Sequence, residues 1–166
     1  SLLETIDIQA FQNTRLIAVT VPHTVKAIGT NAFYNCLSLN TVSFDSNSIL
    51  ETIGSQAFMQ AAVIDITIPV SVKAIGVDAF KSCTSLTSLA VSCASTMAID
   101  STAFTSSSIT SLSLPSTVIY TGPDVRKTIA SCSLCGIGKY SATGDDGSGA
   151  CSSCNAGSST DRKSVV

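Results

Sequence analysis

Four cysteines near the C-terminus have the residue type and spacing best suited to chemistry in this 166-residue chain. They form two Cys-x2-Cys pairs, Cys132 with Cys135 and Cys151 with Cys154, and 15 residues separate the pairs. This spacing can supply four thiolates to one zinc ion. The segment between the pairs is rich in glycine and serine, however, and small domains with so little apolar material usually depend on disulfides formed in an oxidising compartment. We therefore expect disulfides and no cofactor, and we keep a zinc ion at these four cysteines and four reduced thiols as alternatives.

No other group of residues has the arrangement that catalysis needs. His23 is the only histidine, and it follows Pro22 without a nearby cysteine or serine in a motif that would make it a general base. Asp145 and Asp146 lie among glycines without the ligand spacing of a calcium-binding hand. No glycine-rich segment leads into the lysine and hydroxyl residue of a phosphate-binding loop. We therefore predict no catalytic residue and no enzyme activity.

The composition excludes several classes of partner. Charged residues make up 12% of the chain, hydrophobic residues make up 45%, and the formal net charge is −2. This balance leaves no basic surface for nucleic acid. No apolar run approaches the roughly 18 to 20 residues that a membrane-spanning helix needs. Because Leu2 already lies inside a repeat, we expect the chain to be a piece of a longer protein.

A repeat occupies most of the chain and must position whatever function it carries. Five times, an isoleucine is followed five positions later by a phenylalanine that has an alanine before it. The pairs are Ile6 and Phe11, Ile28 and Phe33, Ile53 and Phe58, Ile75 and Phe80, and Ile99 and Phe104. The phenylalanines are 22 to 25 residues apart, which is typical of a solenoid. We expect these five phenylalanines to form the structural core, and we expect a function that depends on an extended surface.

A second apolar set follows each phenylalanine and predicts one short strand per repeat. Its last two members alternate with small or polar residues, as Val42 and Phe44 do, and this alternation is typical of a strand with one buried face. The segment from the isoleucine to the phenylalanine is too short for a long helix. We expect a turn or a short helical stretch there.

The residues between the buried ones predict an outward face of the strands. Because stacked strands lie about 4.8 Å apart, five repeats would give a small, flat face, rich in hydroxyls and nearly uncharged. The face lacks the Trp, Tyr and Arg anchors of tight protein interfaces. It is either a solvated surface or a weak contact surface that many copies make useful. The candidate binding residues are Thr20, Thr41, Ser43, Asp65, Thr67, Ser88, Ser111 and Ser113.

Two kinds of unit alternate, and their motif resembles a known family. Residues 25–29 recur at 72–76, and Cys36 and Cys83 each stand three positions after a phenylalanine. The pattern of a strand, Pro, x-x-Val-x-x-Ile-Gly-x-x-Ala-Phe-x-x-Cys-x-x-Leu resembles BspA-like leucine-rich repeats over about residues 2–118. The resemblance implies a curved α/β-type solenoid with parallel strands, as in surface proteins of bacteria and protists with roles in adhesion or recognition. The two cysteines would be roughly 10 Å apart, too far for a disulfide, so we expect small buried hydrophobic residues.

The repeat is expected to end in a degenerate sixth unit. This unit would start at Val118, but Thr121 stands where an isoleucine is expected. A short helix at about residues 124–130 would then cap the open end of the solenoid. Cys93 has no evident mate in the solenoid, so it is either a free thiol or pairs outside this chain.

The C-terminal cysteines also resemble a known family. The pattern Cys-x2-Cys-x2-Gly-Lys-Tyr-Ser, followed by a second Cys-x2-Cys-x2-Gly, resembles ephrin-receptor-like cysteine-rich repeats over about residues 131–160. This resemblance implies a link between Cys135 and Cys151, with Cys132 and Cys154 paired to neighbouring modules. Spacing alone leaves three pairings of the four cysteines open.

These patterns predict two domains and three functional hypotheses. The domains are a solenoid over residues 1–130 and a small disulfide-rich module, incomplete, over residues 131–166. The first hypothesis is an extracellular or cell-surface recognition and adhesion module that binds protein or glycan through the solenoid face. One alternative is a structural subunit or spacer of a larger extracellular assembly without its own ligand. The other alternative requires reduced cysteines and is an intracellular zinc-bearing scaffold.

Overall fold

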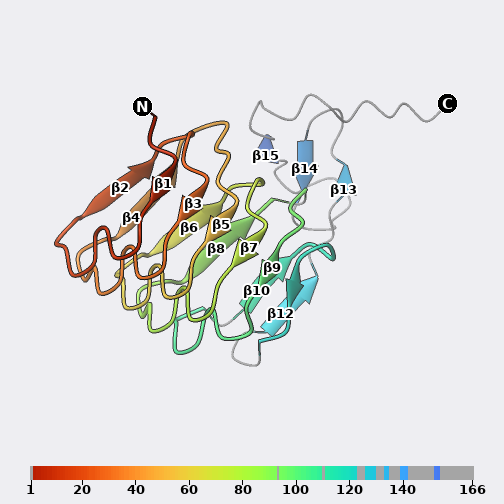
Figure 1. The fold of residues 1–166 in the computed structure, drawn as a ribbon. Helices are drawn as coiled ribbons and strands as arrows, with labels where there is room; N and C mark the ends of the chain where they lie inside the picture. Colours follow the sequence, from red (N-terminus) through yellow and green to blue (C-terminus); the bar gives the residue numbers. More distant parts are fainter. Residues whose placement is uncertain are drawn as a thin grey trace.

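The repeats stack into a parallel-strand solenoid (Figure 1). The computed structural model describes residues 2–92, 94–109, 111–122, 126–129, 133–134, 139–141 and 152–153. Each turn contributes a long strand to one side of the solenoid and a short strand to another side, and apolar side chains from both sets of strands form one continuous core. No helix occurs among the residues that the structure describes, so the predicted helical component is wrong for this part of the chain.

The long strands form the sheet that the alternating pattern predicts. Its four paired strands are β2 (Ala18–Val21), β4 (Thr41–Phe44), β6 (Asp65–Ile68) and β8 (Ser88–Val91). The corresponding strand of the fifth turn, β10 (Ser111–Leu114), pairs in parallel with β12 (Arg126–Ile129). Pro22, Pro69 and Pro115 directly follow β2, β6 and β10, where the missing amide donor removes no bond from the ladder.

A second parallel sheet contradicts the prediction of one strand per repeat. Its six strands are β1 (Thr5–Ile6), β3 (Ala27–Ile28), β5 (Thr52–Ile53), β7 (Ala74–Ile75), β9 (Ala98–Ile99) and β11 (Ile119–Tyr120). In each strand the second residue is buried and the first is not. The isoleucine itself therefore lies in a strand, and the predicted turn begins after it, because the residues that lead to the phenylalanine form turns and no helix occurs in these described segments. A strand of two residues is too short to show an alternating pattern.

On the third side of each repeat, the backbone forms tight turns around the phenylalanine. The residue two positions after each phenylalanine has a left-handed backbone, with φ between 56° and 61°. These residues are Asn13, Asn35, Gln60, Ser82 and Ser106. Most L-residues disfavour this conformation, and asparagine tolerates it best. The left-handed residue lets the chain reverse quickly and return towards the next long strand.

The phenylalanine rings stack through the centre of the solenoid. Neighbouring rings from Phe11 to Phe104 have centroids 5.2, 5.1, 5.3 and 5.7 Å apart and interplanar angles of 6°, 4°, 6° and 15°. The four rings after the first are at most 1% exposed, whereas Phe11 is 36% exposed because no ring precedes it in the stack. The rings therefore form a column that runs along the axis.

The sixth unit continues the short-strand sheet, contrary to the predicted breakdown at Thr121. Tyr120 pairs with Ile99 and is buried, so a tyrosine fills the isoleucine position one residue earlier than expected. Its ring lies edge-on to Phe104, with centroids 5.7 Å apart at 70°. The predicted helix at residues 124–130 is also wrong, because residues 126–129 form strand β12.

Three short strands follow the solenoid in the sequence. They are β13 (Ser133–Leu134), β14 (Lys139–Ser141) and β15 (Ser152–Ser153), and they pair in an antiparallel sheet. The predicted disulfide cysteines Cys132, Cys135, Cys151 and Cys154 lie outside the described residues, as does Cys93. The disulfides therefore stay a prediction.

Removal of an inner phenylalanine ring should lower the free energy of unfolding more than removal of the first ring does. We expect Phe58→Ala to lower the free energy of unfolding by about 3 to 5 kcal/mol, because it leaves a cavity between two stacked neighbours. Phe11→Ala should cost only about 1 to 2 kcal/mol, because its ring is partly exposed and has one neighbour. Urea unfolding followed by circular dichroism measures both values. Equal losses would contradict a column in which the inner rings are the main support.

Candidate binding surfaces

The predicted strand face is present on the outside of the long-strand sheet. Thr20 on β2, Thr41 and Ser43 on β4, Asp65 and Thr67 on β6, and Ser88 on β8 are all exposed. Ser111 and Ser113 lie on β10, and their side chains are outside the described part of the structure. The sheet therefore brings six of the eight candidate residues onto one surface.

Part of the hydrogen-bonding capacity of this face is already used within it. The hydroxyls of Thr20 and Ser43 share a hydrogen bond of 2.9 Å between neighbouring strands. The Thr41 hydroxyl donates to the side-chain oxygen of Asn40 at 2.9 Å. No hydrogen bond within the described residues involves the Thr67 or Ser88 side chain. These bonds use some of the hydroxyl donors, whereas acceptor lone pairs stay available along the face and the Thr67 and Ser88 hydroxyls keep their donors as well.

Sequence reasoning missed an apolar edge beside this face. Ile17 and Ile64 directly precede β2 and β6, and they are 65% and 48% exposed. Asn40 and Thr87 occupy the equivalent positions before β4 and β8. Backbone hydrogen bonds link the four residues in the order Ile17, Asn40, Ile64 and Thr87. In the sequence, an isoleucine directly before a strand resembles the buried apolar residues of that strand. The pattern therefore does not indicate that Ile17 and Ile64 are exposed. The edge gives the hydroxyl face an apolar border.

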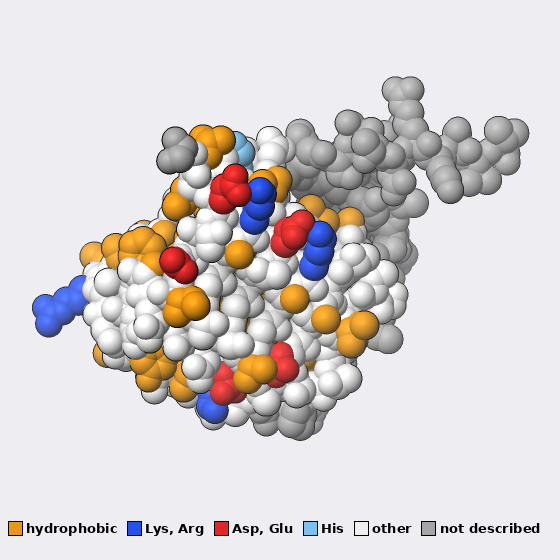
Figure 2. All heavy atoms as spheres, viewed as in Figure 1, with side chains coloured by type: hydrophobic (Ala, Val, Ile, Leu, Met, Phe, Trp, Pro, Cys, Tyr) orange, Lys and Arg blue, Asp and Glu red, His pale blue; other side chains and the backbone are white. Residues whose placement is uncertain are grey.

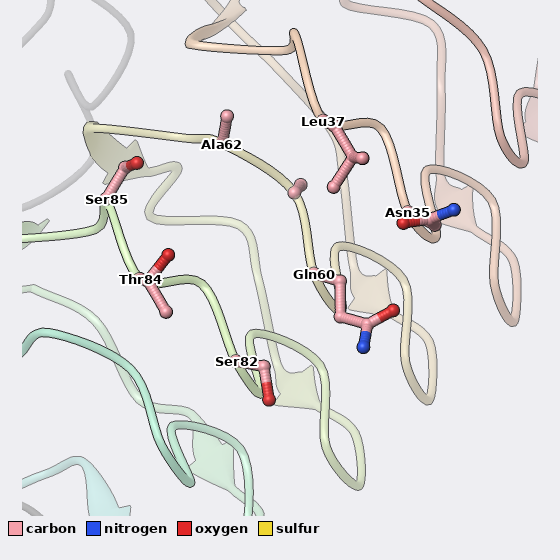
Figure 3. A pocket seen from close by; sticks show the side chains of 8 residues that line it. Asn35, Leu37, Gln60, Ala62, Ser82, Thr84 and Ser85 are labelled. Atoms are coloured by element: carbon pink, nitrogen blue, oxygen red, sulfur yellow. The ribbon is translucent and has the colours of Figure 1, made fainter.

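A hollow lies on the turn side of the solenoid, away from the predicted face. It has a volume of about 470 Å³ and spans three successive turns. Figure 3 shows Asn35, Gln60 and Ser82 in a row across these turns, with Leu37, Ala62, Thr84 and Ser85 beside them. The lining contains amides, hydroxyls and small apolar groups, and no charged side chain.

Two pairs of opposite charge lie on the short-strand side. Lys26 contacts Glu4 at 2.9 Å, and Lys73 contacts Glu51 at 2.7 Å, each pair joining two successive turns. Figure 2 shows such acidic and basic side chains next to each other on an otherwise largely uncharged face. The hydrogen bond from Lys73, followed by its charge, lowers the pKa of Glu51. Because these pairs are exposed, they contribute little to stability, and they leave no strong field of either sign.

The histidine lies on the surface beside one aspartate. His23 is exposed, and its Nδ1 lies 3.9 Å from an Asp45 carboxylate oxygen. Across the described residues, no cluster of three or more His, Cys, Asp or Glu side chains could hold a metal ion. The same residues contain no helix long and apolar enough to cross a membrane.

Cys36 and Cys83 are free, buried thiols inside the solenoid. The Cys36 thiol donates to the Phe11 carbonyl oxygen at 3.0 Å, and the Cys83 thiol donates to the Phe58 carbonyl oxygen at 2.9 Å. Burial raises the pKa of Cys83 to about 12. This thiol is therefore protonated at neutral pH and is a poor nucleophile. The prediction of small buried residues is confirmed, and each thiol also anchors its turn to the preceding one.

Comparison with known families agrees with the repeat motif and with the stacked turns. The model of the BspA type leucine rich repeat region matches residues 4–132 with six copies. The chain belongs to this family. The match covers the long strands, the short strands and the sixth unit, which the sequence pattern predicts to be degenerate. It includes almost none of the cysteine-rich segment, and the likeness of that segment to ephrin-receptor-like repeats has no support from the comparisons.

Solved structures share the fold of this BspA-type solenoid. The pneumococcal vaccine antigen PcpA is 27% identical with a TM-score of 0.66, over 75% of this chain and 33% of that one. A leucine rich cell surface protein from Faecalibacterium prausnitzii is 30% identical with a TM-score of 0.50, over 73% of this chain and 39% of that one. The chain thus spans well under two thirds of either protein.

A more distant structure supports the fold alone. The leucine rich repeat protein of T. pallidum is 22% identical with a TM-score of 0.60, over 75% of this chain and 66% of that one. A search of curated protein sequences found no match.

Proposed function

We propose that the chain is a recognition module outside the cell or on its surface, and that it binds protein or glycan through the strand face. The observation that carries this proposal is the exposed hydroxyl face on β2, β4, β6 and β8, which the core does not use. One similar protein is described as a cell surface protein, and another is described as a vaccine antigen. Solenoids of stacked repeats commonly present such extended surfaces for binding.

The chemistry of the strand face favours weak and repeated contacts. It carries one carboxylate, at Asp65, and otherwise hydroxyl and methyl groups. No Trp, Tyr or Arg stands on it to act as an energetic anchor. Hydroxyl ladders of this kind reach useful affinity when many copies act together.

Bulky charges placed on the strand face should weaken binding. We expect the double variant Thr41→Arg/Thr67→Arg to reduce binding of the purified chain to immobilised matrix proteins and to a glycan array by at least about tenfold, since a 1.4 kcal/mol loss is tenfold. Thr52→Arg is the matched control, because Thr52 is exposed on strand β5 of the other sheet. A loss confined to Thr52→Arg, or binding that neither change affects, would instead support a spacer that contacts its neighbours elsewhere.

We propose disulfides for the four C-terminal cysteines, consistent with an oxidising compartment. Mass spectrometry of the non-reduced chain, after alkylation in denaturant, should find Cys135 and Cys151 linked and not alkylated, as the resemblance to ephrin-receptor-like repeats implies. Metal analysis of the same sample should find no zinc. Cys36 and Cys83 provide the control, because both are free and should be alkylated once the chain unfolds. One zinc ion per chain and four alkylated thiols would overturn the proposal and favour the zinc-bearing scaffold.

A further inference from the structure

The hollow on the turn side arises from the alternation of unit lengths. In the two cysteine-bearing units the next core leucine follows six positions after Phe33 and Phe80. In the unit between them, Val63 follows only five positions after Phe58. The middle connection therefore takes a shorter path across the core than its two neighbours. Ala61 and Ala62 of this connection line the space that the difference leaves.

The walls of the hollow are fixed by bonds to neighbouring turns. Cys36 and Cys83, whose turns flank the middle connection, are held by the thiol bonds to the Phe11 and Phe58 carbonyls. Gln60 has a left-handed backbone with φ of 61°, and its N–H donates to the Lys81 carbonyl at 2.9 Å. The backbone around the hollow is thus held in place before any ligand arrives, which reduces the entropic cost of binding.

The lining has unused hydrogen-bonding groups. The Gln60 side-chain amide makes no hydrogen bond within the described residues. Asn35 uses its amide nitrogen to donate to the Asn13 side-chain oxygen at 2.7 Å, which leaves its own oxygen as an acceptor. Leu37 is 69% exposed and provides the main apolar surface at one side of the hollow. Amides, hydroxyls and three apolar side chains, of which Leu37 is the largest, carry no formal charge and suit a neutral ligand rich in hydroxyls.

We propose that this hollow binds a neutral, linear, β-linked oligosaccharide that runs along the solenoid axis. The row of Asn35, Gln60 and Ser82 repeats with the turns, and the phenylalanine rings of these turns are 5.1 and 5.3 Å apart. One pyranose ring adds a similar length to an extended β-linked chain, so successive sugar rings meet successive turns. The Leu37 methyl groups cover the apolar face of one ring. The volume lies within the range of about 300 to 1,000 Å³ that is typical of ligand sites. This site is independent of the strand face.

A peptide fits the hollow less well. Peptide sites of high affinity depend on aromatic or arginine anchors and on charge complementarity. The lining provides neither. The absence of an aromatic platform also limits the sugar affinity, and we expect a Kd in the millimolar range.

Nuclear magnetic resonance titration of the full chain tests the site. The probes are cellohexaose, N-acetylated chitohexaose, a sulfated heparin hexasaccharide and a leucine-rich hexapeptide. We expect at least one of the two neutral hexasaccharides to shift the backbone amides of Gln60, Ala61, Ala62 and Ser85, and we expect the other two probes to leave them in place.

Two variants decide whether the shifts come from the hollow. Ala62→Arg should fill it and weaken binding at least tenfold, and the fold tolerates this side chain because Arg15 holds the equivalent position four residues after Phe11. Gln60→Gly keeps the left-handed backbone accessible, removes the amide, and should weaken binding about fivefold, the value of one hydrogen bond. Thr67→Arg on the strand face is the control and should bind as the wild type does.

Three results would overturn the proposal. They are the absence of shifts at these amides with both neutral hexasaccharides, equal shifts in the wild type and the two hollow variants, and stronger shifts with the sulfated sugar or the peptide. If Ala62→Arg does not fold, Gln60→Gly alone decides. Because Thr67→Arg alters only the strand face, a failure of the hollow is distinguishable from a failure of the proposed function.

Discussion

The solenoid depends on one contact that is repeated between successive turns. The backbone N–H of each of the first four phenylalanines donates to the carbonyl of the alanine in the next turn, with distances of 2.8 Å for Phe11, 2.7 Å for Phe33, and 2.8 Å for Phe58 and Phe80. The same turns are held by the stacked rings. The accepting alanines are completely buried, so a larger side chain would have no room there. This pairing explains why the Ala-Phe pair recurs in the second to fifth units while its neighbours vary.

A column fixed in this way leaves the rest of each turn free to differ. The connection from the phenylalanine to the long strand is one residue longer in the cysteine-bearing units, yet the spacing of the rings changes little. The extra residue is accommodated at the surface, where it produces the walls of the hollow. The long strands keep a flat hydroxyl face on another side. One core thus supports two surfaces of different shape, and function can change on either without disturbing the stack.

The long strands could be predicted from the sequence, and the short strands could not. A four-residue strand such as β4 shows two outward and two inward residues, which is enough to reveal the alternation. The short strands contain two residues each, and the isoleucine in them resembles any core residue. Tyr120 was missed because the family motif requires an aliphatic residue at that position, whereas the end of the phenylalanine column has room for a ring.

The candidate surfaces were predictable to different extents for a similar reason. The strand face can be predicted from the alternation of outward and inward residues within the strand of a single unit. The hollow depends on a difference in length between three units and on how they stack, and the apolar border depends on the direction in which Ile17 and Ile64 leave the core. Such features appear only when the turns are placed side by side.

Native-state hydrogen exchange of the phenylalanine amides tests the central claim most directly. If the Phe-to-Ala bonds join the turns, the amides of Phe33, Phe58 and Phe80 should exchange only through global unfolding, with opening free energies that match the value from urea unfolding. The amide of Ser46, in an exposed loop, should exchange freely. Fast exchange at Phe58, comparable with that of Ser46, would contradict the account.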